Sequence, residues 1–271
     1  MTYRTFISST LTAAGRMARR FYGNVSASVK SENNNYVLTE ADLAIGKMIV
    51  SVIQREYPAH NIIDEELGVI DKGSNFTWVV DPIDGTSNFA AATPLYGCMI
   101  GVLKDGVPLA GGVTLPSLNQ TYIAEKGSGA TCNGTPIHVS YETNLIDVLV
   151  AYGIDGHPEA PELTRAETRV LNDLILSIRN LRTSNSAYDL MMVATGSYGA
   201  LANKTSKIWD NVAPHIIIEE AGGLYTDYSG KPVNYHGPLE RSQQNFTVCT
   251  ANTHLHAAMQ TILHQSTSTR D

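Results

Sequence analysis

Residues 78–89 are Trp78-Val79-Val80-Asp81-Pro82-Ile83-Asp84-Gly85-Thr86-Ser87-Asn88-Phe89. The β-branched run at the start of this stretch predicts a short buried strand. Asp81 precedes a proline, which disfavours helical backbone at that residue, so we expect the Asp81 carboxylate at the end of the strand. Asp84 and Gly85 then predict a turn, and residues 86–89 predict the start of a helix.

Two kinds of binding group meet in this stretch. The carboxylates of Asp81 and Asp84, three residues apart, can converge on one hard cation. The amides of Gly85 and Thr86 would point from a helix N-terminus toward an anion. The pattern therefore fits a metal site beside a phosphate site, but this stretch taken alone is more often a turn that only caps a helix.

The composition is that of a globular, mildly acidic chain. Its 271 residues suffice for one large domain or two smaller ones, with 43% hydrophobic and 17% charged residues. The net charge of −7 disfavours binding to nucleic acid, which needs a basic surface. A small anionic substrate remains compatible with this charge if metal ions supply local positive charge.

The cysteines and the apolar runs indicate the compartment. Cys98, Cys132 and Cys249 are odd in number, far apart and outside any C-x-x-C motif, which indicates a reduced compartment. The N-terminus lacks an apolar signal core, and no apolar run approaches the ~20 residues that cross a bilayer. We therefore expect a cytoplasmic protein that does not contact a membrane.

The first half of the chain is predicted to be α+β, with two helices followed by an antiparallel meander. Apolar residues at helical spacing predict helices over residues 3–22 and from Thr39 onward. Thr39 to Asp42 resembles a capping box, which gives Asp42 a structural role as an alternative to a catalytic one.

Short apolar runs separated by turn residues predict the strands of this half. Residues 62–63 precede Asp64-Glu65-Glu66, three acids that either face water or approach a metal ion. Further strands are predicted over residues 96–102, 107–114, 120–125 and 137–139, with hairpin turns at Asp105-Gly106 and Asn133-Gly134.

The second half alternates strands and helices, which predicts an α/β arrangement. Strands are expected over residues 147–152, 180–182, 200–202 and 245–250, and helices over residues 159–178, 186–195 and 210–221. Asp210 should begin its helix, with Pro214 in the first turn, so that the Asp210 carboxylate is available for a cap or a metal ion. We expect two units, residues 1–143 and 144–271, around a shared core.

Three signatures follow one another along the chain. They are Ile62-Ile63-Asp64-Glu65-Glu66, then Asp81-Pro82-Ile83-Asp84-Gly85-Thr86, then Trp209-Asp210 with Glu220-Ala221-Gly222-Gly223. In these residues the chain resembles the inositol monophosphatase family of metal-dependent, lithium-sensitive phosphatases, over essentially its whole length. The resemblance implies a layered α-β-α-β-α sandwich, a homodimer, and two or three Mg²⁺ ions as cofactor.

The same resemblance implies metal ligands. Glu65, Asp81 and the backbone oxygen of Ile83 would hold one ion. Asp81, Asp84 and Asp210 would hold a second ion, and Glu65 would help to place a third through water.

The chemistry of phosphate hydrolysis agrees with this set. Mg²⁺ bound to carboxylate and carbonyl oxygens neutralises the phosphate charge and lowers the pKa of water. By family likeness, Thr86 is hydrogen-bonded to Asp42 and orients the attacking water, with Glu65 also catalytic, while the Gly85 and Thr86 amides face the phosphate. The sequence contains no nucleophilic Cys or Ser motif and no G-x-x-x-x-G-K-[ST] loop, which favours direct attack by water over a covalent intermediate and disfavours a kinase or NTPase.

The resemblance places contacts to the leaving group at Asp84, at Asn185-Ser186-Ala187 and at Asn203. Inositol phosphatases of this family resemble Gly-Thr/Ser-Ala in this triplet, so they have Gly where this chain has Asn185. They also carry an acid where Asn203 aligns. An amide donates and accepts hydrogen bonds, whereas a carboxylate only accepts them. We therefore expect the phosphate of a different small polyol or monosaccharide as substrate. Lys30 is either a surface lysine or a contact to phosphate.

Other functions stay open. An inositol-1-phosphatase proper, a histidinol-phosphate phosphatase and a 3′-phosphonucleotide phosphatase are alternatives within the same chemistry. A fructose-1,6-bisphosphatase-like role is less favoured, because few basic residues lie near the signatures. A purely binding relative is the alternative outside enzymes, and the acidic charge and the complete carboxylate set weigh against it.

Overall fold

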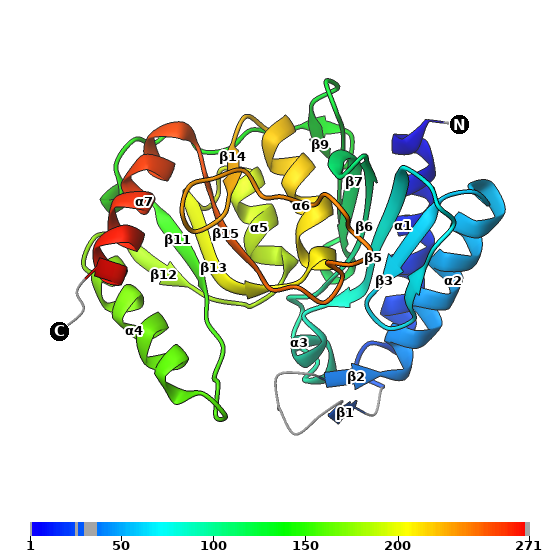
Figure 1. Cartoon of the computed structure of the whole chain (residues 1–271), viewed down its shortest axis with the longest axis horizontal. Helices are drawn as coiled ribbons and strands as arrows, with labels where there is room; N and C mark the ends of the chain where they lie inside the picture. Colours follow the sequence, from blue (N-terminus) through cyan, green and yellow to red (C-terminus); the bar gives the residue numbers. More distant parts are fainter. Residues whose placement is uncertain (1, 25–26, 30–36, 269–271) are drawn as a thin grey trace.

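The computed structural model describes residues 2–24, 27–29 and 37–268, and Lys30 lies outside these ranges. Pairs of helices alternate with two large sheets in five layers (Figure 1). The predicted α-β-α-β-α sandwich is therefore confirmed. The predicted division of the chain at residues 143 and 144 stays a prediction.

Helices α1 (Tyr3–Phe21) and α2 (Glu40–Glu56) form the first layer. Their apolar faces pack on the first sheet in one buried cluster that includes Trp78. The backbone N–H of Thr39 donates to Oδ2 of Asp42 at 2.8 Å, so the predicted capping box at the start of α2 is confirmed. A small antiparallel ribbon of β1 (Ala27–Val29) and β2 (Val37–Thr39) precedes this helix.

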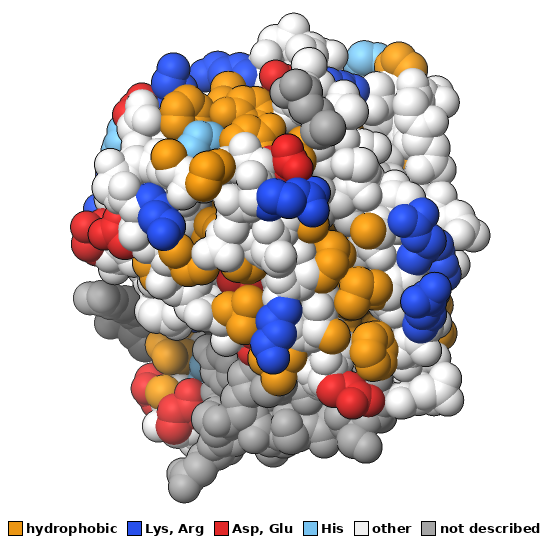
Figure 2. Space-filling model, turned by 90° about the vertical axis from the view of Figure 1, so that its right-hand side faces the viewer, with side chains coloured by type: hydrophobic (Ala, Val, Ile, Leu, Met, Phe, Trp, Pro, Cys, Tyr) orange, Lys and Arg blue, Asp and Glu red, His pale blue; other side chains and the backbone are white. Residues whose placement is uncertain are grey.

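Basic side chains of α1 attach this layer to the loops of the first sheet. Nη1 of Arg4 donates to the carbonyl of Gly129 at 2.9 Å, and Nη1 of Arg19 donates to the carbonyl of Pro116 at 3.1 Å. On the face seen in Figure 2, lysine and arginine side chains stand in separate small groups among hydrophobic, acidic and uncharged ones. These two arginines therefore serve the packing of the helix.

The first sheet has eight strands in the order β10-β9-β8-β7-β6-β5-β3-β4. Their bounds are β3 Asn61–Asp64, β4 Gly68–Ile70, β5 Phe76–Asp84, β6 Gly97–Lys104, β7 Val107–Leu115, β8 Gln120–Glu125, β9 Ala130–Cys132 and β10 Thr135–Pro136. All neighbours pair antiparallel except β3 and β5, which are parallel. The predicted meander from β5 to β8 is therefore confirmed.

Both predicted hairpin turns form. Asp105 and Gly106 have φ of 53° and 75°, and Asn133 and Gly134 have φ of 50° and 82°, the left-handed pairs that two-residue hairpins require. The strand predicted over residues 137–139 is wrong, because the second hairpin pairs Thr135 with Cys132 and ends at β10.

The second sheet has the order β12-β11-β13-β15-β14. Its strands are β11 Leu149–Gly153, β12 Asn180–Arg182, β13 Ala200–Ser206, β14 Leu224–Thr226 and β15 Phe246–Ala251. β11 is parallel to β12 and β13, and β15 is antiparallel to β13 and β14. The predicted α/β character is confirmed, whereas β14 was not predicted and β13 is longer than expected.

Helices α5 (Ala187–Ala194) and α6 (Ile208–Glu220) lie between the two sheets, and α4 (Pro161–Ile175) and α7 (Thr253–Ser268) cover the outer face of the second (Figure 1). The remaining helical segments are α3 (Thr86–Ala90), η1 (Pro116–Leu118) and η2 (Leu145–Asp147). Buried apolar clusters fill the spaces between the layers. Within the described residues, every helix is too short or too polar to span a bilayer.

Helix α6 lies directly on glycines of the first sheet. A Cβ at Gly101 on β6 would lie 2.6 Å from Cγ1 of Val212, and a Cβ at Gly111 on β7 would lie 2.8 Å from Cα of Ala213. The helix begins at Ile208, so the expectation that Pro214 falls in its first turn is wrong. Pro214 has no N–H, and the carbonyl four residues earlier therefore receives no helical hydrogen bond from it.

Candidate functional site

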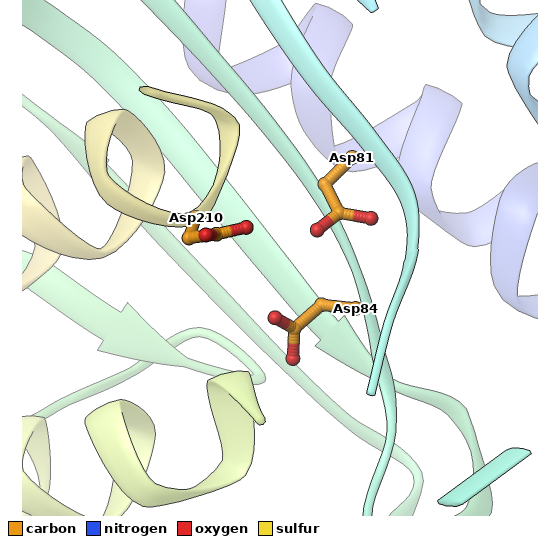
Figure 3. A group of neighbouring side chains, drawn as sticks. All are labelled: Asp81, Asp84 and Asp210. Carbon is orange, nitrogen blue, oxygen red and sulfur yellow. The ribbon is translucent and has the colours of Figure 1, made fainter. Parts of the chain in front are cut away.

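Three carboxylates converge between the two sheets. Asp81 and Asp84 lie on β5, Asp210 lies in the first turn of α6, and their carboxylates point toward one another (Figure 3). One oxygen of each lies within 4.8 Å of the others. Glu65 lines the same cavity of about 550 Å³. The structure thus brings together the four acids that the sequence singled out as metal ligands.

A bulge in β5 places two of these acids on one side. Asp81 pairs with Met99 and Asp84 with Gly97, so β5 contains one more residue than β6 between these two pairs. Residues three apart in a regular strand face opposite sides, and an extra residue turns the second one back. The expectation that the strand ends at Asp81 is therefore wrong, because β5 continues through the bulge to Asp84.

The three carboxylates are held at an electrostatic cost. Asp81 is 1% exposed, its Oδ1 has no hydrogen-bond partner, and burial followed by the charges of Glu65 and Asp84 raises its pKa well above the usual value. Burial is also the main cause that raises the pKa of Asp84 to about 7. Burial and then the charge of Asp84 raise the pKa of Asp210 to about 7.

Backbone amides offset only part of this cost. The N–H of Ala187 donates to Oδ2 of Asp84, and the N–H of Lys207 donates to Oδ2 of Asp210 at 2.6 Å. A divalent cation would offset the remaining repulsion, and carboxylate oxygens are the donors that Mg²⁺ prefers. The uncompensated Asp81 oxygen and the all-oxygen donor set therefore fit Mg²⁺.

Thr86 lies between two oxygen atoms that the sequence linked to the site. Its Oγ1 is 2.9 Å from the carbonyl of Ile83 and 3.4 Å from Oδ1 of Asp42. The single hydroxyl proton can serve one of these oxygens at a time. Asp42 is fully buried, and its Oδ2 is occupied by Thr39. The predicted pair of Thr86 and Asp42 is thus within reach of a hydrogen bond, with the Ile83 carbonyl as the nearer acceptor.

Gly85 makes the close turn between β5 and α3. Its φ is 77°, and a Cβ there would lie 2.8 Å from Cβ of Ser186 and 3.0 Å from the carbonyl of Leu95. A side chain is therefore excluded by both conformation and space. Gly85 and Thr86 line the cavity beside the carboxylates.

The predicted leaving-group residues line the same cavity. Asn185 has φ of 49°, its Nδ2 donates to the carbonyl of Ile154 at 2.8 Å, and the N–H of Ile154 donates to its Oδ1 at 3.3 Å. Ser186 caps α5. Oδ1 of Asn203, on β13, accepts from the N–H of Thr205 at 2.9 Å. The Asn185 side chain is thus hydrogen-bonded to the backbone of Ile154 through both its oxygen and its nitrogen. In Asn203 the hydrogen bond from Thr205 fixes Oδ1, and this also fixes the direction of Nδ2.

Further polar residues of the cavity were not singled out from the sequence. They include Asp155, His157, Glu159, Asp189, Lys207, Asn211 and Tyr225. Asp155 and His157 directly follow β11, which is parallel to both of its neighbours. Ligand sites form beyond the carboxyl ends of parallel strands, so a correct prediction of the β11 pairing would have pointed to these two residues.

The chain is similar to known phosphatases along most of its length. A model of the inositol monophosphatase family matches residues 2–268. An inositol monophosphatase of Mesembryanthemum crystallinum is 33% identical over 225 residues, covering 80% of this chain and 82% of the relative. A histidinol-phosphatase of Chlorobaculum parvum is 32% identical over 223 residues, covering 80% and 83%. The solved structure of an IMPase of Thermotoga maritima superposes with a TM-score of 0.84 at 28% identity, covering 96% of this chain and 95% of that one.

Proposed function

The chain belongs to the inositol monophosphatase family, a family of phosphatases, and we propose that it is a Mg²⁺-dependent phosphomonoesterase that acts on a small polyol or monosaccharide phosphate. The observation that carries this proposal is the convergence of Asp81, Asp84 and Asp210 within 4.8 Å in one cavity. We extend it to a lithium-sensitive homodimer, as the family resemblance implies, and to a cytoplasmic location, as the cysteines and the sequence of the N-terminus indicate.

The proposed metal ligands come from three segments. Glu65, Asp81 and the Ile83 carbonyl would hold one Mg²⁺, Asp81, Asp84 and Asp210 a second, and Glu65 would help to place a third through water. When bound there, Mg²⁺ supplies positive charge to the phosphate and lowers the pKa of water. The mutual repulsion of the buried carboxylates supports this assignment, because a bound cation would relieve it while the carboxylates stay ionised.

The chain's own groups would orient the reactants. With the Thr86 hydroxyl turned toward Asp42, its oxygen would accept a hydrogen bond from the attacking water and so orient it. Glu65, Asp42 and Thr86 are the proposed catalytic residues, and the Gly85 and Thr86 amides are proposed to face the phosphate. Direct attack by water is supported by Cys98, which is fully buried and whose thiol pKa is raised, chiefly by burial.

The proposed leaving-group contacts are Asp84, the triplet Asn185-Ser186-Ala187 and Asn203. Asn203 accepts from Thr205 through Oδ1, so the group it offers to a substrate is its NH₂ donor. An NH₂ donor at residue 203 favours a substrate oxygen that accepts a hydrogen bond from it. This supports a substrate other than inositol phosphate, whose hydroxyls an acid would bind as donors.

Asn203→Asp is expected to change the substrate preference without changing the Mg²⁺ requirement. The carboxylate can keep the hydrogen bond from Thr205 but presents an acceptor in place of the NH₂ group. We expect kcat/KM for the best substrate to fall about tenfold, a change equal to one hydrogen bond of ordinary strength. Steady-state kinetics with two substrates would show it. Equal losses for every substrate would contradict a role in selection.

A panel of phosphate esters tests the function itself. Inorganic phosphate release would be measured with inositol phosphates, pentose and hexose phosphates, histidinol phosphate and 3′-phosphoadenosine nucleotides, each with Mg²⁺ and with a chelator. We expect turnover of a sugar or polyol phosphate that the chelator abolishes. Fastest turnover of inositol 1-phosphate would refute the substrate proposal. Fastest turnover of histidinol phosphate would favour the second candidate, which the similarity to a histidinol-phosphatase supports. Mg²⁺ binding without any release would favour a binding role.

A further inference from the structure

A buried polar side chain follows directly after Asp210. Asn211 is 1% exposed, and its Nδ2 donates to Oγ of Ser206 at 2.9 Å and to the carbonyl of Lys207. Its Oδ1 accepts a hydrogen bond from the hydroxyl of Tyr225 at 2.8 Å. Both amide hydrogens and the amide oxygen are therefore used inside the protein.

These partners fix the orientation of the amide. The reverse orientation would set the amide oxygen against the carbonyl oxygen of Lys207, which has no hydrogen to donate. Burial makes each of the bonds costly to leave unmade. The side chain of Asn211 thus has one stable arrangement, and the first turn of α6 is held with it.

The network connects α6 to three strands of the second sheet. Ser206 ends β13, and its hydroxyl donates to the carbonyl of Phe246 on β15 at 3.0 Å. Tyr225 lies on β14, one of the two edge strands of this sheet. Asp81 and Asp84, in contrast, lie on β5 of the first sheet. The distance between the two sides of the carboxylate group therefore depends on where this network holds the first turn of α6.

We propose that Asn211 and Tyr225 are positioning residues that fix the Asp210 carboxylate at its place for Mg²⁺. They act through the backbone of the α6 turn. Asn211 holds the Lys207 carbonyl, and the N–H of the same Lys207 holds Oδ2 of Asp210. This inference rests on the metal site of the proposed function. It assigns no contact between these two residues and the substrate.

The test compares two tyrosine variants. Tyr225→Phe removes the hydroxyl that donates to Asn211. It keeps the ring, which stacks on His215 with ring centroids 4.5 Å apart. Tyr235→Phe is the matched control, because its buried hydroxyl lies 3.1 Å from Nδ1 of His215 one turn further along α6 and outside the cavity. Both variants lose one buried hydrogen bond on the same helix. Their melting temperatures without metal should therefore fall by similar amounts.

Mg²⁺ affinity separates positioning from general stability. Titration calorimetry on substrate-free protein is expected to show a Kd for Mg²⁺ about tenfold higher in Tyr225→Phe than in the original protein. This is the low end of the effect of groups that orient metal ligands. Tyr235→Phe should bind within about twofold of the original protein, since its network does not reach Lys207. Equal Mg²⁺ affinities in the two variants would overturn the inference.

A second variant keeps the test decisive. Asn211→Ala removes all three bonds, and its Mg²⁺ affinity should fall further than that of Tyr225→Phe if it folds. An original protein that binds Mg²⁺ but releases no phosphate would count against the proposed function alone, because the two tyrosine variants would still differ in Kd. An original protein that does not bind Mg²⁺ would overturn the inference directly.

Discussion

Asp84→Asn is expected to lower phosphate release about a thousandfold, because the charge that it removes helps to hold a cation that stabilises the transition state by several kcal/mol. The fold should persist. The asparagine oxygen can still accept the hydrogen bond from the N–H of Ala187. The measurement is kcat at saturating Mg²⁺, together with the melting temperature of the protein treated with chelator.

The sign of the stability change follows from the pKa of Asp84. Burial raises this pKa to about 7, so the ionised form destabilises the folded protein as pH rises from about 4 through 7. Asparagine removes that penalty, and the metal-free variant at pH 8 should melt no lower than the original protein. Asp105→Asn is a matched control, since it removes one charge in a left-handed turn position that asparagine tolerates. Near-normal turnover of Asp84→Asn would show that Asp84 is not a metal ligand.

Gly111→Ala is expected to cost about 2 kcal/mol of unfolding free energy, the usual range for an overpacked contact. The new methyl carbon would lie 2.8 Å from Cα of Ala213 and 2.8 Å from Cγ2 of Ile216. Because the contact is with the backbone of α6, the helix must move away from the sheet. Asp210 moves with it, so Mg²⁺ affinity should fall together with stability.

The control for this variant is a glycine of α1, the helix that packs against the other face of the first sheet. Gly15→Ala on α1 would place its methyl group 3.6 Å from Thr114, an ordinary contact distance. Alanine also favours a helix over glycine by about 1 kcal/mol, so this variant should be as stable as the original or more so. Denaturant unfolding and Mg²⁺ titration of both variants check the prediction. A Gly111→Ala protein of unchanged stability would mean that α6 does not rest on this glycine.

The sequence predicted what depends on neighbouring residues. The capping box at Thr39 and Asp42 and the left-handed turns at Asp105-Gly106 and Asn133-Gly134 are local, and all of them form. The strand run before Asp81 and the family signatures pointed to the same four acids that line the cavity. Local pattern was therefore sufficient for most of the element types, and the family resemblance for the choice of acids.

The sequence did not predict what depends on pairing between distant segments. The bulge between Asp81 and Asp84 exists only relative to β6, and the edge strand β14 exists only because β15 lies beside it. The hydrogen bond from Tyr225 to Asn211 joins two elements that no local pattern relates. The start of α6 at Ile208 was missed because Pro214 indicated a later first turn, whereas the packing of the helix tolerates the proline inside it.

The carboxylate group has one further consequence, for synthesis of the protein on the ribosome. Asp81 and Asp84 emerge with the first sheet, whereas Asp210 and α6 emerge much later, after β13. Chains grow from the N-terminus and their early parts begin to fold first. A nascent chain that has left the exit tunnel only as far as β10 thus carries every proposed metal ligand except Asp210. The second proposed ion can therefore meet its full ligand set only in a nearly completed polypeptide, and prematurely terminated products lack the share of its stabilisation that depends on Asp210.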